Sequence, residues 1–217
     1  MNYVLVHGGD ISANDFAALC GITTHDDSAS LLGGHVWSRV ATALIACGHC
    51  VYTPTLGDPS EYSLLDHVRQ VKNLLEEHSL EQVVLVGHSY GGMVITGVAA
   101  QVPSKVRSLC YVDAALPDPD QSLFELLELS GMDPLSIIPD KPLAYLQGIH
   151  FSTTVIQSIP QYYVICAKSK FLATVSHAKQ QQAYAQPVRE WMLPTGHVPM
   201  ATMPEELAVC LQACSGD

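Results

Sequence analysis

The chain has 217 residues, of which 48% are hydrophobic and 14% are charged, and its formal net charge is −11. A chain of this size and composition can bury a substantial core, so we expect one folded domain spanning residues 1–217 rather than a disordered regulator. The ten lysines and arginines are scattered along the sequence. This argues against nucleic acid as a partner, because phosphate recognition needs clustered cations.

The cysteines and the N-terminus indicate a reducing compartment. The seven cysteines lack the spacing of a disulfide framework, and the chain enters an apolar stretch without a basic leader, so we expect a cytoplasmic protein. Residues 83–102 are apolar enough to be considered as a membrane span. They contain His88, Ser89 and four glycines, which a strand, a turn and a helix explain better. We expect no membrane partner, metal or cofactor, and we leave homodimer formation open.

Short apolar runs alternate with segments of helical periodicity. Helical spacing predicts a helix from about residue 36 that Gly48 ends, another over 64–75 and a third over 93–102. Thr202 and Glu205 predict a capping box for a final helix. Apolar strands alternating with helices indicate an α/β fold with a mostly parallel sheet covered on both faces. The predicted strands are 3–6, 50–53, 83–86, 108–112, 162–167 and 188–193.

Two stretches interrupt this alternation. Residues 10–34 are polar and rich in small side chains, so we expect an unusually long loop there, near the mouth of the pocket. Residues 116–158 contain several prolines and the apolar segment LFELL. We interpret them as a small helical cap inserted between the fourth and fifth strands.

The segment GHSYG, residues 87–91, fits the pattern G-x-S-x-G. It follows a predicted strand and opens a predicted helix, the context in which a serine is exposed on a sharp turn as a nucleophile. The glycines let the backbone bend, and the helix N-terminus favours the negative charge that develops in acyl transfer. Ser89 is therefore the candidate nucleophile. The alternative is a glycine-rich turn in which Ser89 only caps the helix.

Residues that complement Ser89 follow two other strands. His7-Gly8-Gly9 comes after the first strand, and we expect the backbone N–H groups of Gly9 and Tyr90 to form an oxyanion hole. His197 follows the last strand, where a loop histidine is free to face the nucleophile as general base. Four other histidines are interpreted as surface residues: His49, His67, His78 and His177.

Five longer segments carry a family resemblance: YVLVHGG, GGHVWSRVATALIACGHCVYTPTLGD, LEQVVLVGHSYGGMVITGVA, LCYVDAALPDPDQSLFELL and LPTGHVPMATMPEELA. In these segments the chain resembles the α/β-hydrolase superfamily. More narrowly, it is similar to the small esterases and hydroxynitrile lyases related to plant methyl-ester esterases and their bacterial counterparts. The resemblance implies an α/β-hydrolase fold of about six strands and supports Ser89 and His197 as site residues. It says much less about the substrate.

The assignment of the acid in the implied catalytic triad is less direct. In many members of the superfamily it follows the strand after the cap, but residues 151–189 contain no Asp or Glu, and that position falls near Ser169. Asp113 ends the preceding strand in CYVDAALP, and some α/β hydrolases carry the acid there. We predict that Asp113 orients His197 and stabilises its imidazolium form. The alternative is that Asp113 caps the start of the cap segment.

The sequence thus predicts a cofactor-independent serine hydrolase that cleaves small apolar carboxylic esters or lactones through an acyl-enzyme. We expect the pocket between the carboxyl-terminal edge of the sheet and the cap. Two alternatives use the same fold, because a fold does not fix the reaction. One is lyase or cyclase chemistry in which His197 acts as a base without an acyl-enzyme, and the other is non-catalytic binding of a small molecule.

Overall fold

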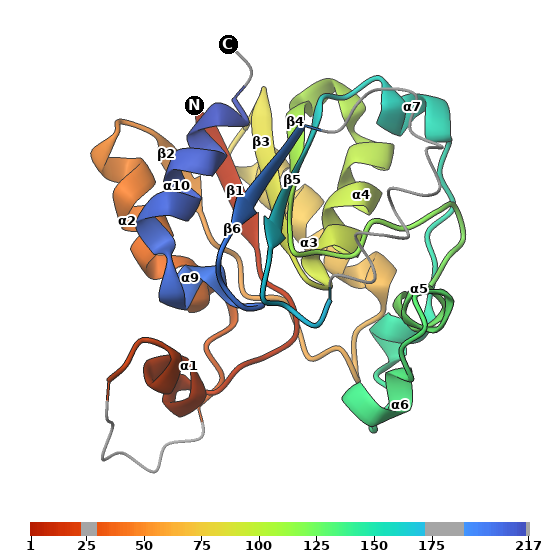
Figure 1. The fold of residues 1–217 in the computed structure, drawn as a ribbon. Coiled ribbons are helices and arrows are strands. Elements are labelled where there is room, and N and C mark those ends of the chain that lie inside the picture. Colours follow the sequence, from red (N-terminus) through yellow and green to blue (C-terminus); the bar gives the residue numbers. More distant parts are fainter. Residues whose placement is uncertain (23–29, 172–188, 216–217) are drawn as a thin grey trace.

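The centre of the molecule is a six-stranded, wholly parallel sheet with the strand order β2-β1-β3-β4-β5-β6 (Figure 1). The computed structural model describes residues 1–22, 30–171 and 189–215. Every predicted strand is present, although residue 188 lies outside the described part. The strands are β1 Asn2–Val6, β2 Cys50–Tyr52, β3 Val83–His88, β4 Val106–Val112, β5 Gln161–Cys166 and β6 Arg189–Leu193.

Helices cover both faces of the sheet, as the sequence predicts (Figure 1). Side chains alternate along each strand, so Val4 and Val6 join one hydrophobic core while Tyr3 and Leu5 join the other. The first core is completed by α3 Leu64–Glu77 and α4 Gly91–Gln101, and the second by α2 Ser38–Ala46 and α10 Pro204–Ala213. Gly48 follows α2 with a φ of +83°, in agreement with its predicted role in ending that helix.

Residues 10–34 are more regular than the loop expected from their composition. The helix α1 Ala13–Leu19 lies within them, and the Ser12 side chain caps it by accepting the Asp15 N–H. A short bridge joins Ser12 to Leu31, and the 3₁₀ turn η1 Gly33–Trp37 leads into α2. The expectation of an irregular stretch is therefore wrong for residues 13–19, while residues 23–29 lie outside the described part of the chain.

Short helices fill the connection between β4 and β5, where the cap is expected. Its first helix starts at a capping box in which Ser122 and Glu125 bind each other's backbone N–H groups. Figure 1 shows this helix beyond the edge at which the strands end. The elements of this segment are α5 Leu123–Leu129, α6 Pro134–Ile137, η3 Leu143–Leu146 and α7 Thr153–Gln157.

The capping box predicted for the final helix is wrong. Thr202 ends a separate short helix, α9 Pro199–Thr202, and its hydroxyl contacts that of Thr195 at 2.5 Å. Pro204 occupies the first turn of α10, where its fixed φ favours the helix and its missing N–H needs no partner. Pro204 therefore starts the helix in place of the predicted box.

Other expectations concern the cysteines and the membrane. All seven cysteines are free thiols. Among the residues that the structure describes, no helix is long and apolar enough to cross a bilayer, and residues 83–102 lie in β3, a turn and α4.

The strand order creates a crevice at one edge of the sheet. After β1 the chain forms β2 on one side of β1, and it then crosses over to form β3 on the other side. The two strands β2 and β3 therefore flank β1. This reversal separates the connections that leave the carboxyl ends of β1 and β3, and open α/β sheets bind their ligands at such points. The candidate residues His7-Gly8-Gly9 and Ser89 follow these two strands.

Candidate active site

Ser89 lies on a strained turn between β3 and α4. Its φ is +53°, a left-handed conformation that is costly for a residue with a Cβ and typical of an exposed nucleophile on a strand-to-helix turn. Gly91 makes the turn sterically feasible, because a Cβ at this position would lie 2.6 Å from the Val6 carbonyl oxygen. The Ser89 carbonyl accepts hydrogen bonds from Gly92 N (3.1 Å) and Ala115 N (2.9 Å), which fix the turn to the segment after β4.

His197 and Asp113 are in direct contact. His197 Nδ1 lies 2.6 Å from Asp113 Oδ2, and the Asp113 side chain is fully buried. This contact fixes the tautomer of neutral His197, since Nδ1 must carry the proton donated to the carboxylate. Nε2 is then the unprotonated nitrogen, as a general base requires. Among the described residues, Asp113 Oδ1 is buried without a hydrogen-bond partner.

The backbone around Asp113 is fixed from two sides. Its φ is +43°, a second left-handed non-glycine residue at the carboxyl edge of the sheet. The Asp113 N–H donates to the Val164 carbonyl at 2.9 Å, and the Tyr163 hydroxyl donates to the Ala114 carbonyl at 2.5 Å. Ser169, at the position where a later acid is expected, is buried, and its hydroxyl accepts the Phe171 N–H.

Two rings contact the imidazole of His197. Phe171 stacks on it, with ring centroids 4.3 Å apart, and the His88 ring lies 4.6 Å away. His88 Nε2 donates a hydrogen bond to the His197 carbonyl oxygen at 2.7 Å, because a carbonyl can only accept. Burial lowers the pKa of His88 well below its ordinary value, so it is held neutral beside the candidate base.

The loop after β1 lies against the serine turn. A Cβ at Gly8 would lie 2.6 Å from Ser89 Cβ, so this position requires glycine. His7 accepts the Leu56 N–H at Nε2 (2.9 Å), and its protonated Nδ1 therefore donates to the Gly8 carbonyl (2.8 Å). Within the described part of the chain, the backbone N–H groups of Gly9 and Tyr90 donate no hydrogen bond. Both remain available to an oxygen of a bound molecule.

The candidate residues border one cavity. Ser89, His197, Gly9 and Tyr90 all line a cavity of about 560 Å³, while Asp113 lies behind His197. This volume suits a small organic molecule. Apolar side chains from residues 10–34, the cap and the segment after β6 supply much of the wall: Ile11, Leu31, Leu123, Ile138, Val198 and Met200.

His67 and Tyr145 also belong to this region, although neither is predicted from the sequence as a site residue. His67 is buried rather than on the surface, since its Nε2 donates to the Gly57 carbonyl (3.0 Å) and its Nδ1 accepts the Tyr90 hydroxyl (2.9 Å). A signal was present, because His67 lies three residues after Leu64 on the apolar face of α3. Tyr145, on η3, contacts the Tyr90 ring at a centroid distance of 4.6 Å. His177 lies outside the described residues.

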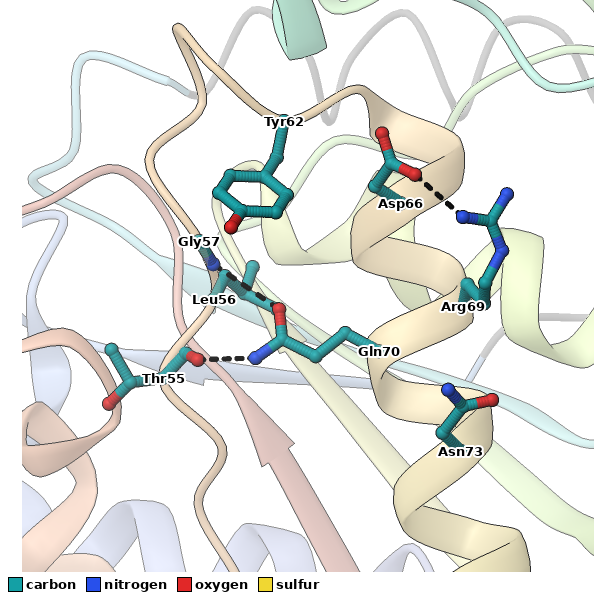
Figure 2. Close-up of a pocket in the computed structure, with 8 residues that line it drawn as sticks. All are labelled: Thr55, Leu56, Gly57, Tyr62, Asp66, Arg69, Gln70 and Asn73. Atoms are coloured by element: carbon teal, nitrogen blue, oxygen red, sulfur yellow. Dashed lines mark hydrogen bonds and ion pairs between the residues drawn. The ribbon is translucent and has the colours of Figure 1, made fainter.

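A second, more open pocket of about 410 Å³ shares no described lining residue with this cavity. Figure 2 shows that Gln70 bridges its wall. The Gln70 side chain donates to the Thr55 carbonyl (2.6 Å) and accepts the Gly57 N–H (3.2 Å). Gln70 thereby fixes the segment whose Leu56 N–H binds His7. We therefore interpret the residues that line this pocket as structural supports for the loop after β1.

Comparisons with known proteins agree with the fold. The model of the α/β hydrolase fold family matches residues 32–136. A carbendazim-hydrolyzing esterase from Nocardioides sp. is 40% identical over 126 residues, which cover 54% of this chain and 50% of the relative. Polyneuridine aldehyde esterase from Rauvolfia serpentina is 28% identical over 131 residues, which cover 56% of this chain and 42% of the relative. The aligned segments thus span half or less of these curated relatives.

Solved structures match almost the whole chain. The crystal structure of polyneuridine aldehyde esterase has a TM-score of 0.72 at 19% identity and covers 99% of this chain and 98% of its own. An extracellular α/β-hydrolase from a Paenibacillus species also has a TM-score of 0.72, at 18% identity, with both chains fully covered. At these identities the likeness shows the fold.

The parallel sheet with a serine turn after β3 has the architecture of the α/β-hydrolase fold, as the sequence predicts. The family model matches residues 32–136, and the chain is similar to plant methylesterases and bacterial esterases, in agreement with the predicted resemblance.

Proposed function

We propose that this protein is a serine hydrolase that cleaves small apolar carboxylic esters or lactones through an acyl-enzyme. The observation that carries the proposal is the convergence of three strand ends. Ser89 after β3 and His197 after β6 line one cavity, and Asp113 after β4 contacts His197 at 2.6 Å. The esterase names of two relatives agree with hydrolysis of an ester.

In the proposed mechanism, Ser89 Oγ attacks the carbonyl carbon of the substrate while His197 Nε2 takes the hydroxyl proton. Asp113 holds the imidazole in this tautomer and stabilises the imidazolium. The backbone N–H groups of Gly9 and Tyr90 then stabilise the negative charge on the carbonyl oxygen. His197 returns the proton to the leaving alcohol, and a water molecule, deprotonated by His197, hydrolyses the acyl-enzyme.

The cavity supports a small, largely apolar substrate. Its volume of about 560 Å³ and its aliphatic wall favour short acyl and alkyl groups. Carboxylates also line it, from Asp10, Asp58 and Asp140. A negatively charged substrate would be repelled by these side chains, so we expect neutral esters to be preferred.

A series of p-nitrophenyl esters with two to eight acyl carbons tests the proposal in rapid-mixing experiments. The acyl-enzyme mechanism predicts a nitrophenolate burst of about one equivalent when deacylation is slow, and loss of turnover in Ser89→Ala. Lyase or cyclase chemistry predicts no covalent adduct. A non-catalytic protein predicts binding of the ester that survives Ser89→Ala without cleavage.

A further inference from the structure

The cap contributes a tyrosine hydroxyl to the cavity next to the candidate oxyanion donors. Tyr145 lies on η3, and only 6% of its surface is exposed. Its position is fixed by its neighbours along the chain, since the Ala144 N–H donates to the Pro59 carbonyl (3.0 Å) and the Tyr145 N–H donates to the Pro142 carbonyl (3.0 Å).

Tyr145 contacts both proposed donors. Its ring packs against the Tyr90 ring at a centroid distance of 4.6 Å, and its Oη lies 3.5 Å from the position that a Cβ of Gly9 would occupy. Within the described part of the chain, this hydroxyl makes no hydrogen bond, although the side chain is nearly buried. Because Tyr145 lines the cavity, a bound molecule or water can form a hydrogen bond with this hydroxyl.

The hydroxyl is a proton donor throughout the working pH range. Burial raises the pKa of Tyr145, and the carboxylates of Asp10 and Asp58 raise it further. A neutral phenol can donate a hydrogen bond to an oxygen that gains negative charge, while the nearby carboxylates disfavour its own ionisation.

We propose that the Tyr145 hydroxyl donates a third hydrogen bond, beside the Gly9 and Tyr90 amides, to the carbonyl oxygen of the substrate as it becomes an oxyanion. This inference rests on the proposed serine hydrolase function. It makes Tyr145 a catalytic residue supplied by the cap, so the position of η3 against Pro59 determines whether the oxyanion hole is complete.

Tyr145→Phe removes the hydroxyl and keeps the ring against Tyr90. The readouts are the rate of labelling by a fluorophosphonate, kcat and KM for p-nitrophenyl butyrate, and inhibition by butylboronic acid, whose serine adduct is tetrahedral. We expect kcat and the labelling rate to fall about 10- to 100-fold, in line with the loss of one oxyanion donor. Boronate affinity should fall by a similar factor, while KM should change less than about twofold.

Tyr52→Phe is the matched control, since the Tyr52 side chain packs against His78 and does not line the cavity. We expect it to behave as wild type. Tyr145→Met provides a second variant without the hydroxyl and should show the same losses as Tyr145→Phe, with unfolding curves confirming that each variant is folded.

The outcomes separate this inference from the proposed function. A labelled wild type together with unchanged kcat and boronate affinity in Tyr145→Phe would overturn the role of Tyr145 alone. A loss confined to KM would also overturn it, because it would indicate ground-state binding. A wild type that neither reacts with the fluorophosphonate nor hydrolyses the ester would overturn both.

Discussion

Nδ1 of His197 lies 2.6 Å from Oδ2 of Asp113, a residue 84 positions earlier in the chain. The contact joins the ends of two strands, β4 and β6, that β5 separates in the sheet. It is long-range in sequence, and it determines which nitrogen of neutral His197 carries the proton.

Asp113→Asn tests the role of this carboxylate. The amide can donate a proton to Nδ1, so it favours the tautomer in which Nε2 is protonated and cannot act as a base. We expect kcat to fall by about 10³- to 10⁴-fold with little change in KM, measured with p-nitrophenyl esters. Near-normal turnover in a folded Asp113→Asn variant would remove Asp113 from the triad.

His88 is predicted to position His197 through its hydrogen bond to the His197 carbonyl. His88→Leu removes this donor, and we expect kcat to fall about 10- to 100-fold because small displacements of a base are costly. His88→Gln retains an N–H donor of similar reach and should recover part of the activity. If the two variants lose equal activity while both remain folded, the hydrogen bond is not what positions the base.

Gly8 is predicted to be required for the shape of the serine turn. A Cβ at this position would lie 2.6 Å from Ser89 Cβ, so Gly8→Ala must displace the nucleophile or the loop. We expect a loss of about 1–3 kcal/mol in the free energy of unfolding and a large loss of turnover. Gly196→Ala is the control, because among the described residues no atom beyond its chain neighbours lies within 4 Å of the corresponding Cβ. Equal unfolding free energies for the two variants would contradict the steric argument.

Three buried histidines predict acid sensitivity. Burial lowers the pKa of His7, His67 and His88 in the folded state, while the unfolded chain titrates near 6.5. The unfolded state therefore binds more protons below pH 6.5, so stability is complete above this pH and is lost as the pH falls towards 5. Each histidine contributes up to about 1.4 kcal/mol per pH unit.

Urea unfolding at pH 8, 7, 6 and 5 measures this dependence. The free energy of unfolding should be nearly constant between pH 8 and 7 and should fall between 6.5 and 5. His67→Gln, which retains a donor and an acceptor for Gly57 and Tyr90, should make the fall shallower. A flat profile from pH 7 to 5 would show that these side chains are not held neutral.

Much of the fold follows from local sequence. The predicted strands are short apolar runs because both faces of a parallel sheet are buried, and all residues of β3 and β5 are indeed buried. The candidate residues Ser89 and His197 were found because they directly follow such runs. Asp113 was selected partly because no acid follows the fifth strand, and its proximity to His197 is a tertiary property.

The features that the sequence did not predict depend on tertiary contacts or on competing local signals. Pro204 starts α10 and overrides the capping pattern of Thr202. Residues 13–19 lie in a stretch expected to be a loop, yet the Ser12 side chain accepts the Asp15 N–H and caps a helix there. Tyr145 has no local signal, since its relation to Gly9 arises only when the cap packs over the edge of the sheet.

The most direct test of the central claim is intact-mass measurement after exposure to a fluorophosphonate, comparing wild type with Ser89→Ala and His197→Ala. The reagent forms a stable adduct only with a serine that a general base activates. We predict one adduct on the wild type, none on Ser89→Ala, and at most slow labelling of His197→Ala. A folded wild type that forms no adduct, or a Ser89→Ala variant that is still labelled once, would contradict the assignment of Ser89 as the nucleophile.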